Sequence, residues 1–405
     1  MAVGVFLCGD VMTGRGVDQI LAHPGDPRLS EHVVTDARTY VRLAEEANGP
    51  IPRPAACSWP WGEALSLLDE AAPDARVINL ETTVTADGRF APEKALHYRM
   101  NPANLAVLTV ARPDVCVLAN NHMLDFGLTG LADTLDALAG AGLRTVGAGR
   151  DAAEAVRPAV VEIHNCGGHG PPRPPQGASP QTPVFCGGHR PPRPPQGASP
   201  QTPSRHRVLV VAAGMPSSGV SRFSAATPAR PGVAFVPDTS AASADALAAS
   251  VTAHKRTGDV AIVSLHWGTN WGYTVDSGQV GFAHRLVESG VDIVHGHSAH
   301  HPRPIEIYRG GLILYGCGDL VNDYEGIGGY EAYRAELRLL YLADVDITGH
   351  ERSVSLRMIP LRARAMRLER ASAADAEWLR AALEHVSRHW GTRIGRGPDD
   401  TLATA

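Results

Sequence analysis

The chain has 405 residues, of which 44% are hydrophobic and 20% are charged, and its net charge is −5 at pH 7. This composition is typical of a globular protein, and the length allows one elaborated domain or two. The negative charge argues against a nucleic-acid partner. The six cysteines form no C-x-x-C pair and suggest no disulfide framework, which is consistent with a reducing cytosol.

The sequence indicates no membrane insertion. The first ten residues, MAVGVFLCGD, lack a basic region, and their apolar run stops at Gly9 and Asp10. No later stretch approaches the roughly 18 apolar residues that a membrane-spanning helix needs. We therefore expect a cytoplasmic protein without a signal peptide or an anchor.

Apolar runs alternate with helical patterns along the chain. We expect buried strands at VGVFLCG, ARVINL, VCVLAN, VAIVSL, VDIVHG and LILYGCG, in chain order. Apolar residues recur at helical spacing over 128–142 and 279–290, and both patterns end at glycine. Two strand-like segments and an amphipathic helix follow residue 335. The alternation predicts an α/β fold with a largely buried sheet.

One segment interrupts this pattern. Residues 166–183 recur almost unchanged at 186–203, and proline, glycine, glutamine and serine dominate both copies. This composition cannot bury enough apolar surface to fold alone, so we expect a disordered insert over 166–203 between two strands, PAVVEI and RVLVVAAG. Recognition of its P-x-x-P sequences by a partner protein remains open.

The predicted strands end at residues that bind metals or carry protons. Loops are wet, so any single polar residue after a strand has an ordinary explanation, but six strand ends in succession carry Asp, Glu, Asn or His. In open α/β sheets, ligands bind outside the carboxyl ends of the strands. We therefore expect one cleft lined by Asp10, Glu81, Asn121, His122, His266, His295, His297 and Asp319.

The segment DIVHGHSAHHPRP, residues 292–304, concentrates His295, His297, His300 and His301 directly after an apolar run. A neutral imidazole is a common metal ligand and the usual proton carrier near neutral pH. Mixed oxygen and nitrogen ligands suit Mn, Fe or Zn better than Ca or Mg. The pattern therefore indicates a divalent metal site.

Two further clusters have open interpretations. EKALHYRM places Lys94, His97 and Arg99 together, where they can bind a carboxylate or a phosphate or can lie on an exposed loop. HWGTNWGY places Trp267 and Trp271 after His266, where they can wall a substrate pocket or pack in the core.

Five motifs occur together: GDVM, NLETTVT, ANNHMLDFG, SLHWG and VHGHSAHHPRPIEIYRGGLILYGCGDLVND. In this ordered set the chain resembles the CapA family of poly-γ-glutamate capsule synthesis (PGA_cap), within the calcineurin-like metallophosphoesterase superfamily. The resemblance implies a metallophosphoesterase-like αββα sandwich with ligands at the C-terminal ends of the strands. We expect this domain over 1–345 and a C-terminal strand and helix extension over 346–405 packed on it.

The resemblance also implies roles for the site residues. His122 would act as the acid that protonates a leaving group, with Asp125 orienting it and His295 supporting the ligands. The usual Asp-x-His motif is absent, because Val11 and Met12 follow Asp10, so we expect one or two divalent ions. The implied metal ligands are Asp10, Glu81, Asn121, His266, His297 and His300. The expected substrate contacts are Lys94, His97, Arg99, Trp267, Trp271, His301 and Asp319.

Three functions are consistent with these motifs. The first is a metal-dependent hydrolase of polyglutamate or capsule metabolism, which acts on a phosphoester or a γ-glutamyl or peptide-like substrate. The second is a metal-dependent epimerase of a residue in a ribosomal peptide. The third is a non-catalytic, metal-bound assembly factor for a polymer synthase. The oligomeric state remains open.

Overall fold

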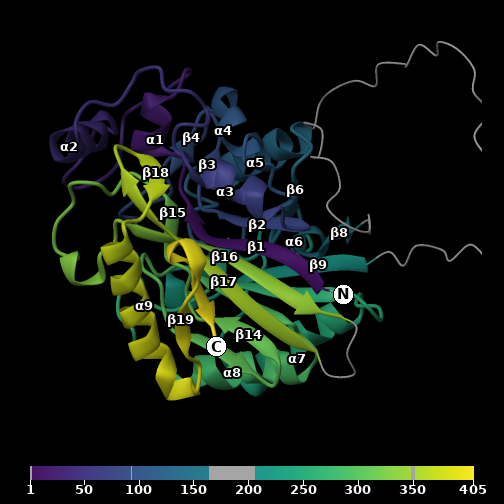
Figure 1. Cartoon of the computed structure of the whole chain (residues 1–405). Helices are drawn as coiled ribbons and strands as arrows, with labels where there is room; N and C mark the ends of the chain where they lie inside the picture. The colour runs from purple at the N-terminus through teal and green to yellow at the C-terminus, as the bar shows by residue number, and fades with distance from the viewer. Residues whose placement is uncertain (1, 93, 164–205, 348–351) are drawn as a thin grey trace, which may run out of the picture.

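The computed structural model describes residues 2–92, 94–163, 206–347 and 352–405. The described residues form two large β-sheets that share a core, with helices on the outer face of each (Figure 1). The predicted α/β class is therefore confirmed. The predicted insert at 166–203 lies outside the described residues.

The larger sheet mixes parallel and antiparallel strands. Its order is β19-β20-β17-β16-β1-β2-β5-β6, with β15 paired to β1 and β18 paired to β17. The neighbours β1, β2, β5 and β6 run parallel, so their carboxyl ends meet at one edge. The strands are β1 (Ala2–Val11), β2 (Ala75–Leu80), β5 (Val115–Val117), β6 (Arg144–Val146), β15 (Asp319–Val321), β16 (Leu337–Asp346), β17 (Ser353–Arg364), β18 (Arg367–Arg370), β19 (Ile394–Arg396) and β20 (Leu402–Thr404).

The smaller sheet has the order β13-β14-β12-β11-β9-β8. Its four inner strands run parallel, and the edge strands β8 and β13 are antiparallel to their neighbours. The strands are β8 (Ala159–Ile163), β9 (His206–Gly214), β11 (Val260–His266), β12 (Ile293–His297), β13 (Ile305–Tyr308) and β14 (Gly311–Leu314). Two small ladders join β3 (Thr83–Val84) to β4 (Arg99–Met100) and β7 (Ala148–Gly149) to β10 (Gly232–Val233).

Alternating side chains of β1 show how the layers arise. Val5 and Leu7 belong to the core between the two sheets, whereas Phe6 and Cys8 belong to the core under the helices. A strand buried on both faces reads as a continuous apolar run, which is why these strands are visible in the sequence.

Helices cover both outer faces (Figure 1). The helices α1 to α5 lie over the larger sheet, α7 and α8 lie over the smaller one, and α9 packs beside β17 and β19. The predicted helices at 128–142 and 279–290 correspond to α5 and α8. The bounds are α1 (Arg15–Ile20), α2 (Arg38–Asn48), α3 (Ala64–Ala71), α4 (Ala106–Thr109), α5 (Gly127–Gly140), α6 (Ala152–Ala155), α7 (Ala241–Thr252), α8 (Ser277–Glu288) and α9 (Ala373–Ser387).

The expectation of a single strand at LILYGCG is wrong. The strand β14 ends at Leu314, and Asp319 begins β15, which pairs with β1 in the other sheet. Gly318 makes this crossing with a φ of +74°, a conformation that favours glycine. A Cβ on Gly9 would lie 1.6 Å from the Gly318 carbonyl oxygen, so these two segments contact each other through their backbones.

The C-terminal region continues the larger sheet. The strand β17 pairs with β16 from Leu337 opposite Arg362 to Asp346 opposite Ser353, and β20 pairs with β17. The α9 side chains Leu379 and Leu383 join the core between the sheets. The division of the chain at residue 345 remains a prediction, and it falls one residue before the end of β16.

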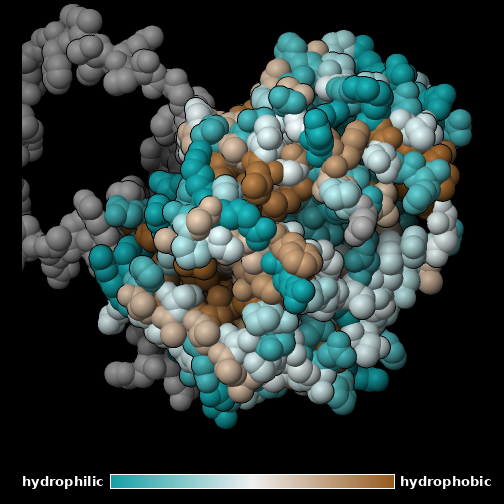
Figure 2. All heavy atoms as spheres, turned by 180° about the vertical axis from the view of Figure 1, so that it is seen from behind, coloured by the Kyte–Doolittle hydropathy of each residue, from teal (hydrophilic) through white to brown (hydrophobic). Residues whose placement is uncertain are grey.

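The surface is mixed in character. Figure 2 shows hydrophilic residues over most of one face, with hydrophobic residues gathered in separate patches. Among the described residues, no helix has the length and apolar character needed to cross a membrane.

Candidate metal centre

Acidic and histidine side chains from both sheets meet at the carboxyl ends of the parallel strands. Asp10 lies near the end of β1, His266 and His297 close β11 and β12, and Glu81 directly follows β2. Asp319 enters from β15 and lies opposite Asp10 in the parallel pairing. All five side chains are buried. The predicted convergence of strand ends is therefore present.

Two groups of side chains have the geometry to hold a metal ion. Donor atoms of Asp10, His266 and His297 all lie within 4.8 Å of one another, and so do donor atoms of Asp10, His300 and Asp319. Asp10 belongs to both groups, which allows one ion or two ions that share it. Asp319, expected from the sequence to contact the substrate, lies beside the potential metal ligands.

Hydrogen bonds fix the first group. The Nδ1 atoms of His266 and His297 lie 2.8 Å apart, and His266 Nε2 lies 3.0 Å from Asn121 Oδ1. Ser264 Oγ lies 2.9 Å from His297 Nε2 and 3.0 Å from His295 Nδ1. The sequence analysis missed Ser264, although it lies two residues before His266 in the same strand, which places both side chains on one face.

The second group is also oriented by polar contacts. His300 Nδ1 lies 2.9 Å from Asp319 Oδ1, and Asn322 Nδ2 donates to Asp319 Oδ2 at 2.7 Å. Burial opposes protonation of His300, but the Asp319 carboxylate outweighs it and raises the pKa of His300. The protonation of His300 therefore depends on Asp319, a carboxylate that is itself a potential metal ligand.

The buried carboxylates favour a cation. Burial, and then the neighbouring Asp319, raises the pKa of Asp10 to about 7, and burial together with Asp10 raises the pKa of Glu81 well above its usual value. The buried Oε2 atom of Glu81 has no hydrogen-bond partner. Buried charges are costly unless they are paired or bind a metal, and these donors are the oxygen and nitrogen atoms that Mn, Fe or Zn prefer. The donor set therefore fits a divalent ion.

Asn79 is a further residue that the sequence analysis missed. Its Nδ2 donates to Asp10 Oδ1 at 2.6 Å, and its Oδ1 accepts from Asn120 Nδ2 at 3.2 Å. Asn120 also accepts from the backbone N–H of His122 at 3.1 Å. The two amides therefore join the shared carboxylate to the segment that carries His122. Asn79 lies two residues before Glu81, and this spacing is the only signal in the sequence.

His122, Asp125 and Lys94 form a polar cluster beside Glu81. His122 Nδ1 lies 2.7 Å from Asp125 Oδ2, and its Nε2 lies 3.7 Å from Glu81 Oε1. Lys94 Nζ donates to Asp125 and to the Asn121 carbonyl oxygen, and lies 3.1 Å from His122 Nδ1. The structure thus brings His122 and Asp125 together as expected, whereas Lys94, expected to contact the substrate, holds Asp125 and the Asn121 carbonyl oxygen.

The electrostatics of this cluster keep His122 neutral. Burial, assisted by the Lys94 ammonium and opposed by Asp125, lowers the pKa of His122 to about 4. The shorter contact of Nδ1 is with Asp125, so Nδ1–H donates to that carboxylate and Nε2 is left without a proton. In this state His122 accepts a proton before it donates one.

Tyr98 and Tyr324 line the cluster on one side. The Tyr98 ring lies edge-on to His122 at 4.5 Å, and the two tyrosine hydroxyls lie 2.6 Å apart. The Tyr324 ring packs against His300 at 5.2 Å. The buried guanidinium of Arg15 lies 4.5 Å from the centre of the Tyr98 ring and forms an ion pair with Asp323. Tyr98 thus packs against His122, and Tyr324 packs against His300 of the second donor group.

His97 and Arg99 are directed elsewhere. His97 Nε2 lies 2.8 Å from the Ala91 carbonyl oxygen, and the Arg99 guanidinium lies 4.5 Å from the centre of the Phe126 ring. Arg99 also lies 3.9 Å from Asp26. In the described residues, neither side chain is hydrogen-bonded to a metal-capable residue. Their substrate role remains a prediction, without a contact at the centre to support it.

The two tryptophans have different surroundings. Trp267 is fully buried, stacks on Tyr315 and donates from Nε1 to the Tyr315 carbonyl oxygen at 3.2 Å, so it packs in the core. Trp271 is partly exposed, stacks on Tyr330 with 3.8 Å between ring centres and lies 5.5 Å from the His300 ring. Trp271 therefore flanks the candidate centre.

His301 has both ring nitrogens engaged. Its Nε2 accepts from the Gly272 N–H at 3.1 Å, and its Nδ1 lies 3.0 Å from the Pro302 carbonyl oxygen. Burial lowers the pKa of His301 to about 4, so the ring is neutral near pH 7. The hydrogen bond from Gly272 ties His301 to the loop that carries Trp271. His301 therefore offers no free ring nitrogen to an anion.

Comparison with known proteins agrees with these motifs. Residues 4–169 and 193–324 match the model of the bacterial capsule synthesis protein PGA_cap. The chain belongs to the PGA_cap family. Both matched ranges of the PGA_cap model contain metal-capable residues, with Asp10 in the first and His266, His297, His300 and Asp319 in the second.

Curated relatives extend the PGA_cap assignment along the chain. The chain is 52% identical over 401 residues to a probable polyglutamine synthesis accessory protein of Mycobacterium tuberculosis, which covers 99% of this chain and 95% of that protein. It is 27% identical over 246 residues to the PGA biosynthesis protein CapA of Bacillus subtilis, with 60% of this chain and 52% of that protein covered. It is 23% identical over 318 residues to the capsule biosynthesis protein CapA of Bacillus anthracis, with 78% and 59% covered.

Proposed function

We propose that this chain is a metal-dependent enzyme of polyglutamate capsule metabolism with a metallophosphoesterase-like sandwich fold. Its substrate is a phosphoester or a γ-glutamyl or peptide-like polymer. The observation that carries the proposal is the pair of donor groups that share Asp10, placed beside the His122–Asp125–Lys94 cluster. The printed names of the relatives supply the link to polyglutamate.

The residues that would hold the metal are those of the two donor groups. Asp10, His266 and His297 would hold one ion, and Asp10, His300 and Asp319 would hold the other. Glu81 Oε2, buried and without a partner, and the Asn121 amide complete the set. A bound divalent ion would polarise a substrate oxygen and lower the pKa of a bound water to about 7.

The chain's own residues supply the proton transfer. Asp125 accepts from His122 Nδ1–H and so directs the unprotonated Nε2 toward Glu81 and the donor groups. Lys94 holds Asp125 and the Asn121 carbonyl oxygen, which keeps the segment Asn121–His122 in place. His122 would then take a proton from the attacking water at Nε2 and give it to the leaving group.

A second function has one observation in its favour. The relatives that are 52% identical are named accessory proteins of polyglutamine synthesis. A metal-bound assembly factor for a polymer synthase would carry the same centre without turnover.

The test combines metal content and turnover. Elemental mass spectrometry of the purified protein is expected to find one or two equivalents of Mn, Fe or Zn, which His297→Ala loses. His284→Ala is the matched control, because His284 pairs with Glu306 outside the donor groups. Turnover is then measured on γ-linked glutamate oligomers and on an aryl phosphodiester.

The outcomes separate the two functions. Metal-dependent cleavage that His122→Asn abolishes would support the enzyme. Bound metal without cleavage of either substrate would favour the assembly factor. Absence of metal after incubation with each ion would contradict both.

A further inference from the structure

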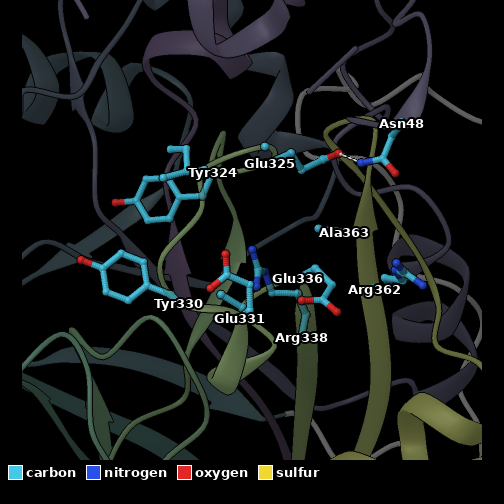
Figure 3. A pocket seen from close by; sticks show the side chains of 12 residues that line it. Asn48, Tyr324, Glu325, Tyr330, Glu331, Glu336, Arg338, Arg362 and Ala363 are labelled. Atoms are coloured by element: carbon cyan, nitrogen blue, oxygen red, sulfur yellow. Dashed lines mark hydrogen bonds between the residues drawn. The ribbon is translucent and has the colours of Figure 1, made fainter. Parts of the chain in front are cut away.

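A second polar pocket lies next to the candidate metal centre. It encloses about 170 Å³ between the loop that carries Tyr324 to Glu336 and the strands β16 and β17 (Figure 3). Tyr324 separates it from the centre, because this ring lines the pocket and also packs against His300 at 5.2 Å. The Tyr324 side chain therefore lies between the pocket and His300, a potential metal ligand. The side chains that matter here are Tyr330, Glu331, Glu336, Arg338 and Arg362.

Arg338 is the reason to expect a ligand there. Its side chain is buried, with 2% of the residue exposed, and its Nε has no hydrogen-bond partner. Its other nitrogens donate to neutral acceptors, Asn322 Oδ1 at 3.0 Å and the Leu337 carbonyl oxygen at 3.2 Å. No carboxylate of the described residues is hydrogen-bonded to it. Figure 3 shows its guanidinium directed toward the middle of the pocket.

A buried guanidinium in this state favours an anion. Burying a charge is costly unless it is paired and hydrogen-bonded, and an arginine matches the planar geometry of a carboxylate. Arg338 is attracted electrostatically, without a hydrogen bond, by the carboxylates of Asp319, Glu325 and Glu336. A carboxylate brought in by a ligand would give this guanidinium an anionic partner, which no described residue provides at hydrogen-bonding distance.

The acidic side chains of the pocket favour a cation on the same ligand. Glu331 Oε1 accepts from the Gly329 N–H at 2.9 Å, and Glu336 Oε1 accepts from Arg334 Nε at 2.7 Å. Each of these hydrogen bonds uses one carboxylate oxygen and leaves the other. Two other charged residues of the lining already have partners: Glu325 accepts from Asn48 and from the Ala365 and Met366 N–H groups, and Arg362 lies 3.8 Å from Asp375. The remaining charges are one guanidinium and two carboxylates, which match a group that carries both charges.

We propose that this pocket is a subsite for a free amino-acid end of a peptide-like substrate, with the carboxylate on Arg338 and the ammonium on Glu331 and Glu336. Its volume suits one amino-acid unit, since pockets for drug-sized ligands enclose roughly 300–1,000 Å³. A phosphate would match Arg338 but would face Glu331 and Glu336 with like charge. The role in substrate positioning rests on the proposed function, whereas the binding itself needs no turnover.

The test is calorimetric titration of the full-length protein, as purified and after chelation, with L-glutamate, acetate and inorganic phosphate. L-Glutamate is expected to bind, with acetate and phosphate at least about tenfold weaker. Glu331→Gln and Arg338→Lys are expected to weaken glutamate binding about threefold and about tenfold. Glu377→Gln, an exposed position on α9 paired with Arg380, is the matched control and is expected to change nothing.

Each outcome decides the proposal. Glutamate binding that weakens in Glu331→Gln and Arg338→Lys but not in Glu377→Gln supports it, and it does so even if the protein proves to have no hydrolase activity. Phosphate binding as tight as glutamate binding would replace the subsite with a simple anion site. Absence of heat with all three probes in the folded wild type would overturn the proposal, while the metal and turnover tests of the proposed function would stand unaffected.

Discussion

Asp10 is the residue at which protons and a metal ion compete. Burial and the Asp319 carboxylate raise its pKa to about 7, so without a cation Asp10 is protonated below about pH 7 and ionised above it. A metal needs the ionised form, so we expect its affinity to rise as the pH increases through about 7. His266 and His297 add little to this dependence, because burial lowers the pKa of both and they are already neutral.

The measurement is a titration of Mn²⁺ or Zn²⁺ into the chelated protein from about pH 6 to about pH 8. The affinity is expected to increase at least about tenfold per pH unit below pH 7, because Asp10 releases one proton per ion and the raised pKa values of Glu81 and His300 add to the proton release. Asp10→Asn is expected to remove both the binding and its pH dependence. An affinity that is constant across this range would contradict the assignment of Asp10 as a ligand.

Lys94 acts on the titration of His122. The pKa of His122 is lowered by burial and by the Lys94 ammonium, while Asp125 raises it. Lys94→Met removes a like charge, so the pKa of His122 is expected to rise, as followed by NMR of the imidazole carbons in the chelated protein. Lys255→Met is the matched control, because Lys255 pairs with Asp292 instead. An unchanged or lower pKa of His122 in Lys94→Met would show that the ammonium does not reach the ring.

The crossing of β1 and β15 positions the shared carboxylate. Gly9 precedes Asp10, and a Cβ at Gly9 would overlap the Gly318 carbonyl oxygen at 1.6 Å. Gly9→Ala is therefore expected to destabilise the fold by about 3 kcal/mol or more and to weaken metal binding, measured by chemical denaturation and metal content. Gly281→Ala on α8, where nothing lies within 4 Å, is the matched control and is expected to stabilise by about 0.5–1 kcal/mol. Equal stability of the two variants would contradict the close approach.

The elements that sequence reasoning predicted are those whose signal is local. The runs ARVINL and VAIVSL are buried on both faces, so their pattern alone predicts strands, and parallel neighbours bring Glu81 and His266 to one edge. The crossing at Gly318 was missed because apolar content does not say which sheet a residue joins. The number and spacing of histidines likewise predict a centre, but not that Asp10 is shared by two donor groups.

Residue roles that depend on where a side chain points were harder to predict from the sequence. Lys94 and Arg99 are five positions apart, yet one contacts Asp125 and the other packs on Phe126. Trp267 and Trp271 also differ, since only the second leaves the core. Arg338 lies within the apolar run of β16, and nothing in that run reveals that Asn322 receives its hydrogen bond and that the Nε has no partner. These features arise from segments that are distant in the sequence.

Residues after 345 form part of the common core rather than a loosely attached extension. The strand β17 pairs with β16 along the full length of β16, and the core between the sheets contains Leu356, Met358, Leu379 and Leu383. Removal of residues 348–405 would expose this core and leave β16 as an unpaired edge. We expect the truncated chain to aggregate or to unfold, as followed by circular dichroism and size-exclusion chromatography.

A matched deletion tests whether this effect is specific. Ile163 and His206 are register partners at the ends of the antiparallel strands β8 and β9, so a short Asn-Gly turn can join them in place of residues 164–205. That variant is expected to keep the native circular dichroism spectrum and the bound metal, because both donor groups found among the described residues lie outside this segment. A truncated chain that stays folded and binds metal would instead support a separable domain over 1–345. Loss of the fold in both variants would mean that residues 164–205 also contribute to stability.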